Sequence, residues 1–109
     1  MVTSVAAGTQ ASVITTEHEL VNETVAGFYL GDISLKNMAS GDTVEIRKYV
    51  IIISGGTEDV FLETFAGVQD ETVSTYKYFA PEYKTESFRV TLKHTIGTTK
   101  NFDYQFYRQ

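Results

Sequence analysis

The sequence predicts an all-β fold, an antiparallel β-sandwich or small barrel of about 6–8 strands. Apolar and polar residues alternate with period two in several segments of the 109-residue chain. Gly, Asn and Asp separate these segments at intervals of roughly 10–15 residues, as turns do in all-β proteins. No stretch has the apolar period of a helix long enough to cover a sheet. We expect residues 12–109 to form a single β-sandwich domain.

Residues 1–11 are predicted to be an extended N-terminal arm. Small and polar residues dominate this segment and gain little from burial in a core. Val2 and Val5 are its β-branched apolar residues and are candidate contacts to a partner chain. We therefore expect removal of residues 1–10 to weaken partner binding while the domain stays folded.

Two short strands and a turn are predicted next. Residues 13–16 and 24–30 are rich in β-branched and aromatic residues, and the polar residues between them are interpreted as a connection. Ser34 could cap a short helix and Gly41 could end it, because glycine adopts positive φ at low cost. A short loop helix or turn is therefore expected near residues 34–41.

Residues 43–53 and 60–66 read as a β-hairpin joined by the turn residues Gly55 and Gly56. Alternation places a common set of apolar side chains on one face of the first strand, namely Val44, Ile46, Val50 and Ile52. The continuous apolar run over residues 49–53 indicates that the end of this strand is covered on both sides, which favours a neighbouring subunit.

Three further strands are predicted in the C-terminal part. Residues 73–80 form one, ended by Pro81, which cannot donate to a ladder. Residues 87–94 alternate clearly, with Phe88, Val90 and Leu92 on the inner face. After a turn at residues 96–101, residues 102–107 form the closing strand.

Composition disfavours several functional classes. The net charge of -5 and the scattered Lys and Arg residues disfavour contact with phosphate backbones, so we expect no nucleic-acid partner. The absence of cysteine removes disulfides, thiolate nucleophiles and Cys-type zinc sites. The sequence shows neither a signal-peptide pattern nor a long apolar span, so we expect no membrane. No cofactor is expected, and the protein would be made in the cytoplasm and kept in solution or in an assembly.

Catalytic and metal-binding constellations are not evident. His18 and His94 are the only histidines, and His94 falls on an apolar face, where a hydrogen-bonded or edge-located histidine is more common than a ligand or base. No Gly-x-Ser-x-Gly motif accompanies the Ser, His and Asp residues, so no hydrolase is predicted. The acidic residues of segment 17–23 are interpreted as solvated. We expect no catalytic residue and no metal site.

An aromatic group near Pro81 is the best candidate for a binding surface. Its members are Tyr76, Tyr78, Phe79 and Tyr83. Such side chains can stack on sugars or fill a protein interface, and they can equally complete a core. A carbohydrate-binding or receptor-binding module is the alternative function that this group suggests; the resemblance given next would place such a module on a spike or tail.

Residues 34–47, the turn at residues 54–57 and residues 88–98 resemble small, uncharacterised virion-associated proteins of tailed bacteriophages. The resemblance covers about residues 12–109. It implies a non-enzymatic virion protein of the head decoration or cement type, located on the capsid surface. The implied partners are the major capsid protein and copies of the chain itself, as a trimer or another homo-oligomer. A place at the head-to-tail junction or in the tail is left open.

Overall fold

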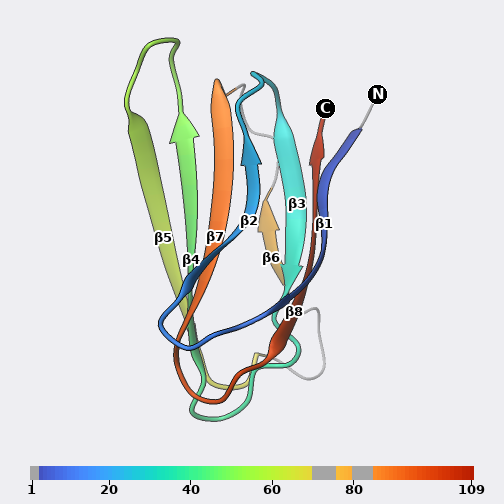
Figure 1. Ribbon diagram of the computed structural model, residues 1–109, viewed down its shortest axis with the longest axis vertical. Helices are drawn as coiled ribbons and strands as arrows, with labels where there is room; N and C mark the ends of the chain where they lie inside the picture. The colour runs from blue at the N-terminus through green and yellow to red at the C-terminus, as the bar shows by residue number, and fades with distance from the viewer. Residues whose placement is uncertain (1–2, 70–75, 80–84) are drawn as a thin grey trace.

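The computed structural model describes residues 3–69, the backbone of residues 76–79, and residues 85–109. These residues form two four-stranded antiparallel sheets, and no helix occurs among them (Figure 1). The predicted all-β sandwich is confirmed. The strands are β1 (Thr3–Ala11), β2 (Glu17–Glu23), β3 (Tyr29–Ser34), β4 (Thr43–Ile51), β5 (Glu58–Ala66), β6 (Tyr76–Phe79), β7 (Ser87–Ile96) and β8 (Asn101–Arg108).

The strand order is β1-β8-β3-β6 in the first sheet and β2-β7-β4-β5 in the second. Four ladders, β1–β8, β2–β7, β3–β6 and β4–β5, share one centre in the sequence. For every pair of opposite residues in them, the position halfway between the two residue numbers lies within one residue of Gly55. The chain is therefore one long antiparallel hairpin, folded so that successive pairs lie in alternate sheets. Gly55 has a φ of 77° at the tip, where a glycine avoids backbone strain. This arrangement is the jelly roll.

The core lies between the two sheets and is built from alternate residues of each strand. Phe88, Val90 and Leu92 of β7 are buried, as their alternation predicts. Phe102 and Phe106 of β8 are fully buried on the opposing sheet. The rings of Phe88 and Phe106 meet edge to face with centroids 5.9 Å apart, which joins the two layers.

Residues 3–11 belong to the first sheet, contrary to the prediction of a separate arm. They form β1, which pairs with β8 from Thr3 opposite Arg108 to Ala11 opposite Asn101. Val5 and Ala6 are half-buried and pack against the core. Small residues suit this edge strand because they let β1 lie close to the aromatic side chains of β8. Val2 lies outside the described residues.

The N-terminal strand boundaries also differ from the prediction. Residues 13–16 form a turn with Thr15 at a φ of 69°, whereas the polar segment taken as a connection is β2. The polar residues of β2 face solvent. Leu20 and Val21 are consecutive and yet both buried, because a register shift between Glu19 and Val21 interrupts the alternation of inward and outward side chains. Of the predicted strand 24–30, only Tyr29 onward is β3.

Residues 35–42 form consecutive turns rather than a helix. Met38 N–H donates to Leu35 C=O at 3.1 Å, and Asp42 N–H donates to Ala39 C=O at 3.0 Å. The turn alternative of the prediction is thus the observed one. These turns carry Leu35 and Met38 into the end of the core, where both side chains are buried.

The hairpin of residues 43–66 has the predicted strands, but its apolar end is not covered by the described residues. β4 ends at Ile51, and Ile52 and Ile53 are 45% and 68% exposed. The expectation that Ile52 shares the buried face of Val44, Ile46 and Val50 is wrong, because the strand stops before it. A neighbouring subunit at this end remains a prediction.

β6 lies within the predicted strand 73–80, and residues 73–75, 80 and 81 of that prediction lie outside the described residues. In the part of the chain that the structure describes, no helix is long and apolar enough to span a membrane.

Candidate functional site

Three buried polar residues from distant parts of the sequence meet at one end of the sandwich. Ser12 follows β1, Asp42 precedes β4, and His94 lies in β7 on the inner face. Their exposed fractions are 3%, 2% and 0%, respectively. Buried polar groups need hydrogen-bond partners, and these three side chains satisfy one another. We call Ser12, His94 and Asp42 the buried polar network.

The hydrogen bonds of this network have a defined direction. Ser12 Oγ is 2.9 Å from His94 Nδ1, and His94 Nε2 is 3.1 Å from Asp42 Oδ1. A carboxylate can only accept, so Nε2 carries a hydrogen and donates it to Asp42. In the neutral ring Nδ1 is then an acceptor, and Ser12 O–H donates to it. This is the order of a Ser-His-Asp triad, with the two ring nitrogens exchanged relative to the serine proteases.

Asp42 accepts three further hydrogen bonds. The donors are Ala39 N–H at 2.8 Å, Thr98 N–H at 3.2 Å and the Lys100 ammonium, whose Nζ is 3.3 Å from Oδ2. Burial alone would raise the pKa of Asp42, but the bonds from Ala39, Lys100, Thr98 and His94 outweigh it and hold the pKa below its ordinary value of 3.8. The carboxylate is therefore kept ionised at the centre of the network.

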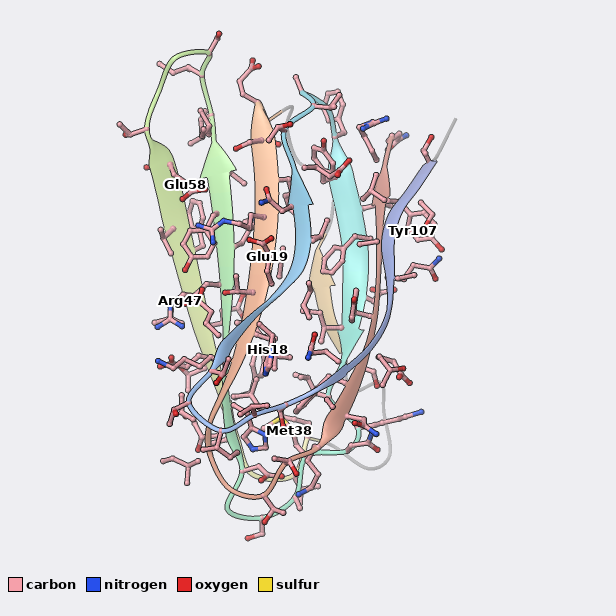
Figure 2. All side chains as sticks on the ribbon, viewed as in Figure 1. His18, Glu19, Met38, Arg47, Glu58 and Tyr107 are labelled. Carbon is pink, nitrogen blue, oxygen red and sulfur yellow. The ribbon has the colours of Figure 1, made fainter. Side chains whose placement is uncertain are left out.

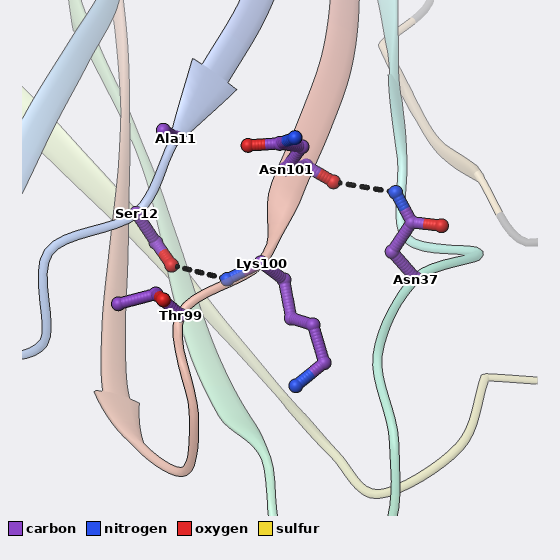
Figure 3. A pocket seen from close by; sticks show the side chains of 6 residues that line it. All are labelled: Ala11, Ser12, Asn37, Thr99, Lys100 and Asn101. Atoms are coloured by element: carbon purple, nitrogen blue, oxygen red, sulfur yellow. Dashed lines mark hydrogen bonds between the residues drawn. The ribbon is translucent and has the colours of Figure 1, made fainter.

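Ser12 has little freedom to act as a nucleophile. Its Oγ also accepts a hydrogen bond from Lys100 N–H at 2.9 Å, and Ser12 N–H donates to Lys100 C=O at 2.9 Å (Figure 3). A surface depression of about 520 Å³ lies beside it, lined by Ala11, Ser12, Asn37, Thr99, Lys100 and Asn101. The hydroxyl faces inward to His94 and to the backbone, so a substrate in the depression would meet a serine whose oxygen is already bonded on two sides.

The sequence predicted that His94 is either hydrogen-bonded or located at an edge, and the structure shows the hydrogen-bonded alternative, with the ring fully buried. Ser12 and Asp42 were not singled out, because their proximity to His94 arises only when β1, β4 and β7 meet at one end. The sequence did contain one signal for these partners. A histidine on an apolar face needs hydrogen-bond partners for both ring nitrogens, and polar residues that can serve as partners occur at the ends of the flanking strands.

A second polar cluster covers the outer face of the second sheet. Glu17 Oε2 accepts from Tyr49 Oη at 2.7 Å and from Thr91 Oγ1 at 2.6 Å. Burial would raise the pKa of Glu17, but these two bonds outweigh it and lower the pKa. Arg89 lies 3.8 Å from the Tyr49 ring centroid and pairs with Glu58 of β5 at 3.0 Å. The cluster joins β2, β7, β4 and β5 side by side.

The second sheet ends in an exposed apolar strand, β5. Val60, Phe61 and Leu62 are 52%, 48% and 50% exposed, and all residues of β5 except the half-buried Phe65 are exposed. Among the described residues, β5 pairs only with β4, so its second edge has no partner strand there. Figure 1 shows β5 at the outer side of the sandwich, and Figure 2 shows Glu58 on it. We call the side of residues 58–66 that points away from β4 the β5 edge.

The β5 edge lies at the end of the second sheet that is farthest from β2. β1 and β2 contact each other at the opposite side and close the two sheets there. On the inner face of β5, the Lys48 ammonium lies 5.0 Å from the centroid of the Phe61 ring. A lysine and an aromatic ring thus occupy a position that a core residue fills elsewhere in the sheet.

Of the residues predicted as partner contacts, only Val5 has its side chain in the described part of the chain. Val5 packs on the core from β1. The backbone register places Tyr76 opposite Ser34, Tyr78 opposite Asp32 and Phe79 opposite Gly31. Tyr83 and the side chains of residues 76–79 lie outside the described residues. Among the described residues, no three His, Asp or Glu side chains form a cluster that could hold a metal ion.

Comparisons of this chain with protein-family models, with curated proteins and with solved structures gave no match.

Proposed function

We propose that this protein is a non-enzymatic structural component of a tailed-bacteriophage particle, a decoration or cement protein that binds the outer shell and stabilises it. The observation that carries the proposal is the β5 edge. Three of its apolar side chains, Val60, Phe61 and Leu62, are about half exposed, and among the described residues the strand pairs only with β4. The resemblance of residues 12–109 to virion-associated proteins is the reason that we propose a virion as the assembly to which the chain binds.

The β5 edge has few of the features that prevent strands from pairing. Proteins blunt their sheet edges with lysine, proline, bulges or short strands. β5 contains no lysine and no proline, and its register with β4 is regular over the whole strand. Its acidic residues leave the centre, Val60 to Leu62, uncharged. Strand addition from another chain would satisfy this edge.

The fold supports the same role by analogy alone. Jelly rolls recur as building blocks of viral shells and as lectin domains, and one fold serves many functions. A shell protein uses such a domain as a rigid unit whose edges and loops make the contacts. The analogy is compatible with the glycan-binding alternative as well, whose aromatic side chains lie outside the described residues.

The buried polar network has a structural role in this proposal. It ties the end of β1, the turn before β4 and the β7–β8 turn together through Ser12, Asp42 and Lys100. Such a fixed end suits a domain that must transmit load between neighbours. The bonded and buried state of Ser12 is the reason that we propose no hydrolase.

Stabilisation of a shell would arise from many weak contacts. Copies bound to adjacent shell subunits act together, because each contact raises the effective concentration of the next. A ligand that binds only the assembled shell stabilises it in proportion to its binding free energy. No chemical step is required.

Cryo-electron microscopy of purified particles that contain this chain, with mass spectrometry to count its copies, tests the proposal. Hundreds of copies on the icosahedral lattice would support a decoration role. A dozen or fewer copies at one vertex would replace that role with one at the junction or tail, and absence from particles would overturn the virion assignment.

A binding assay tests the part played by the β5 edge. Particles that lack the protein are incubated with the wild type, with Leu62→Lys, and with the control Val25→Lys, which alters an equally exposed apolar residue before β3. We expect Leu62→Lys to lose occupancy and Val25→Lys to keep it. Full occupancy by both variants would show that the β5 edge does not support binding.

A further inference from the structure

We propose that the outer face of the first sheet carries a saccharide-binding site between β3 and β8. A surface depression of about 230 Å³ lies there, and the described residues that line it are Asp32, Ser34, Lys36, Asp103, Tyr104 and Gln105. We call it the β3–β8 depression. It belongs to the first sheet and the β5 edge belongs to the second, so saccharide binding goes beyond the proposed shell binding and is measured separately from it.

The β3–β8 ladder brings the polar side chains of the depression together. Asp32 lies opposite Gln105, and Ile33 lies opposite Tyr104 at the next position. Ile33 is fully buried, so alternation turns Asp32 away from the core, and Gln105 shares its face. Opposite residues have Cβ atoms about 4.5–5.5 Å apart, which is near enough for one small ligand to contact both side chains.

Ser34 is the residue that points to a ligand. It lies two positions after Asp32 on the same face of β3 and is only 7% exposed. Among the described residues, its Oγ nevertheless has no hydrogen-bond partner. A buried hydroxyl without a partner destabilises a fold, and buried polar groups are nearly always bonded. We therefore expect this hydroxyl, in the wall of the depression, to bond a molecule that enters it.

The other polar groups of the depression suit a neutral ligand with several hydroxyls. The Asp32 carboxylate can only accept hydrogen bonds, the Lys36 ammonium can only donate them, and the Gln105 amide can do both. Each hydroxyl of a sugar ring donates one hydrogen bond and accepts others, so adjacent hydroxyls can use a carboxylate and an amide side by side. Asp103 accepts a hydrogen bond from Thr9 Oγ1 at 2.6 Å, which fixes a second carboxylate in the wall.

Charge and size disfavour other classes of ligand. The two carboxylates repel a phosphate or another anion, and the Lys36 ammonium opposes a metal ion. In the part of the chain that the structure describes, no three His, Asp or Glu side chains form a metal cluster. The depression is smaller than the about 300–1,000 Å³ of pockets for drug-sized ligands, so it suits one ring of a saccharide. We expect a Kd on the order of 1 mM for a single sugar.

NMR titration of the isotope-labelled protein tests the site. The probes are D-glucose, D-galactose, D-mannose and N-acetyl-D-glucosamine, each added up to about 50 mM, well above the expected Kd. We expect at least one sugar to shift the backbone amides of residues 32–36 and 103–105 and to leave those of β2 and β5 unchanged. Inorganic phosphate and calcium chloride are added separately as probes of the other ligand classes. Shifts at these amides with phosphate or calcium only, or with none of the four sugars, would overturn the proposal.

Variants separate a binding role of Ser34 from a structural one. Ser34→Ala removes a hydroxyl that has no partner among the described residues, so its unfolding midpoint in urea should equal or exceed that of the wild type. Its affinity for the sugar should fall roughly two- to ten-fold, because one hydrogen bond is lost. Lower stability with unchanged affinity would overturn the role of Ser34 in binding.

The charged acceptor has a matched control on the other sheet. Asp32→Asn should weaken sugar binding roughly ten-fold or more, because hydrogen bonds to a charged acceptor are the stronger ones. Asp59→Asn changes an exposed carboxylate of β5 in the same way and should bind the sugar like the wild type. Equal affinities of the two variants would overturn the assignment of the site to the β3–β8 depression.

Discussion

Replacing Asp42 by alanine is the perturbation that tests the buried polar network most directly. The carboxylate accepts hydrogen bonds from two backbone N–H groups, from Lys100 and from His94. Alanine accepts none of them. The backbone donors of Ala39 and Thr98 lie near the surface and can bind water, whereas Nε2–H of the fully buried His94 has no other acceptor.

The expected loss of stability follows from these contacts. Each near-surface bond to the charged group is worth about 1 kcal/mol, and leaving the buried imidazole donor unsatisfied costs about 1–3 kcal/mol. The total is about 3–5 kcal/mol, the range for removing one partner of a buried pair. With a urea slope of roughly 1.5 kcal/mol/M, the unfolding midpoint should fall by about 2–3 M.

The loss should depend on pH. The pKa of Asp42 is lower in the folded protein than in the unfolded chain, so the ionised carboxylate stabilises the fold above about pH 4. This contribution disappears as the pH falls through the folded pKa. The difference between wild type and Asp42→Ala should therefore be largest near neutral pH and should narrow below about pH 4.

Urea unfolding followed by circular dichroism at pH 7 and at acidic pH measures both effects. Asp103→Ala is the matched control, because its exposed carboxylate accepts one bond from Thr9 Oγ1. We expect it to change stability by less than about 1 kcal/mol. A similarly small change for Asp42→Ala, or a change that is the same at both pH values, would refute the role assigned to the network.

Four other outcomes follow from the geometry. Gly97→Ala should lose more than about 2 kcal/mol of stability in the same assay, because the φ of Gly97 is 118° and an added Cβ would lie 2.9 Å from Asp42 Cα. A Gly97→Ala variant as stable as the wild type would contradict this. Deletion of residues 1–10 should lower the melting temperature by about 10 °C or more, because β8 loses its neighbouring strand β1. An unchanged melting temperature would support the original prediction that residues 1–11 are an arm outside the domain. A fluorophosphonate probe should not label Ser12 in the folded protein; stoichiometric labelling would revive a hydrolase. The triple variant Val60→Thr, Phe61→Thr and Leu62→Thr should unfold within about 1.5 kcal/mol of wild type but lose occupancy on particles, and retained occupancy would exclude the β5 edge.

The sequence predicted the fold class and the strands with strong alternation, such as β7 and β8. The sequence-based prediction was wrong where tertiary contacts determine whether a segment forms a strand. β1 is made of small residues that signal no strand, and it becomes one because β8 presents a free edge. β2 was missed because the bulge after Glu19 interrupts its alternation.

The buried polar network illustrates the same limit at the level of a site. His94 alone could be assigned from its place on an apolar face. Ser12 and Asp42 lie in turns where serine and aspartate are common, and nothing local distinguishes them. Their partnership with His94 depends on the jelly-roll topology, which brings strand ends from the whole chain together.

The same topology explains why the β5 edge, rather than another strand, is available for assembly. A hairpin folded about Gly55 places its innermost pair, β4 and β5, at the end of the second sheet. The outermost pair, β1 and β8, lies at the other end of the first sheet, where β1 contacts β2 and the sandwich closes. Val60, Phe61 and Leu62 of β5 are about half exposed, so they contribute little to this chain's core. Apolar residues in such a position are not required by the fold, which is the physical reason to seek their role in contact with another chain.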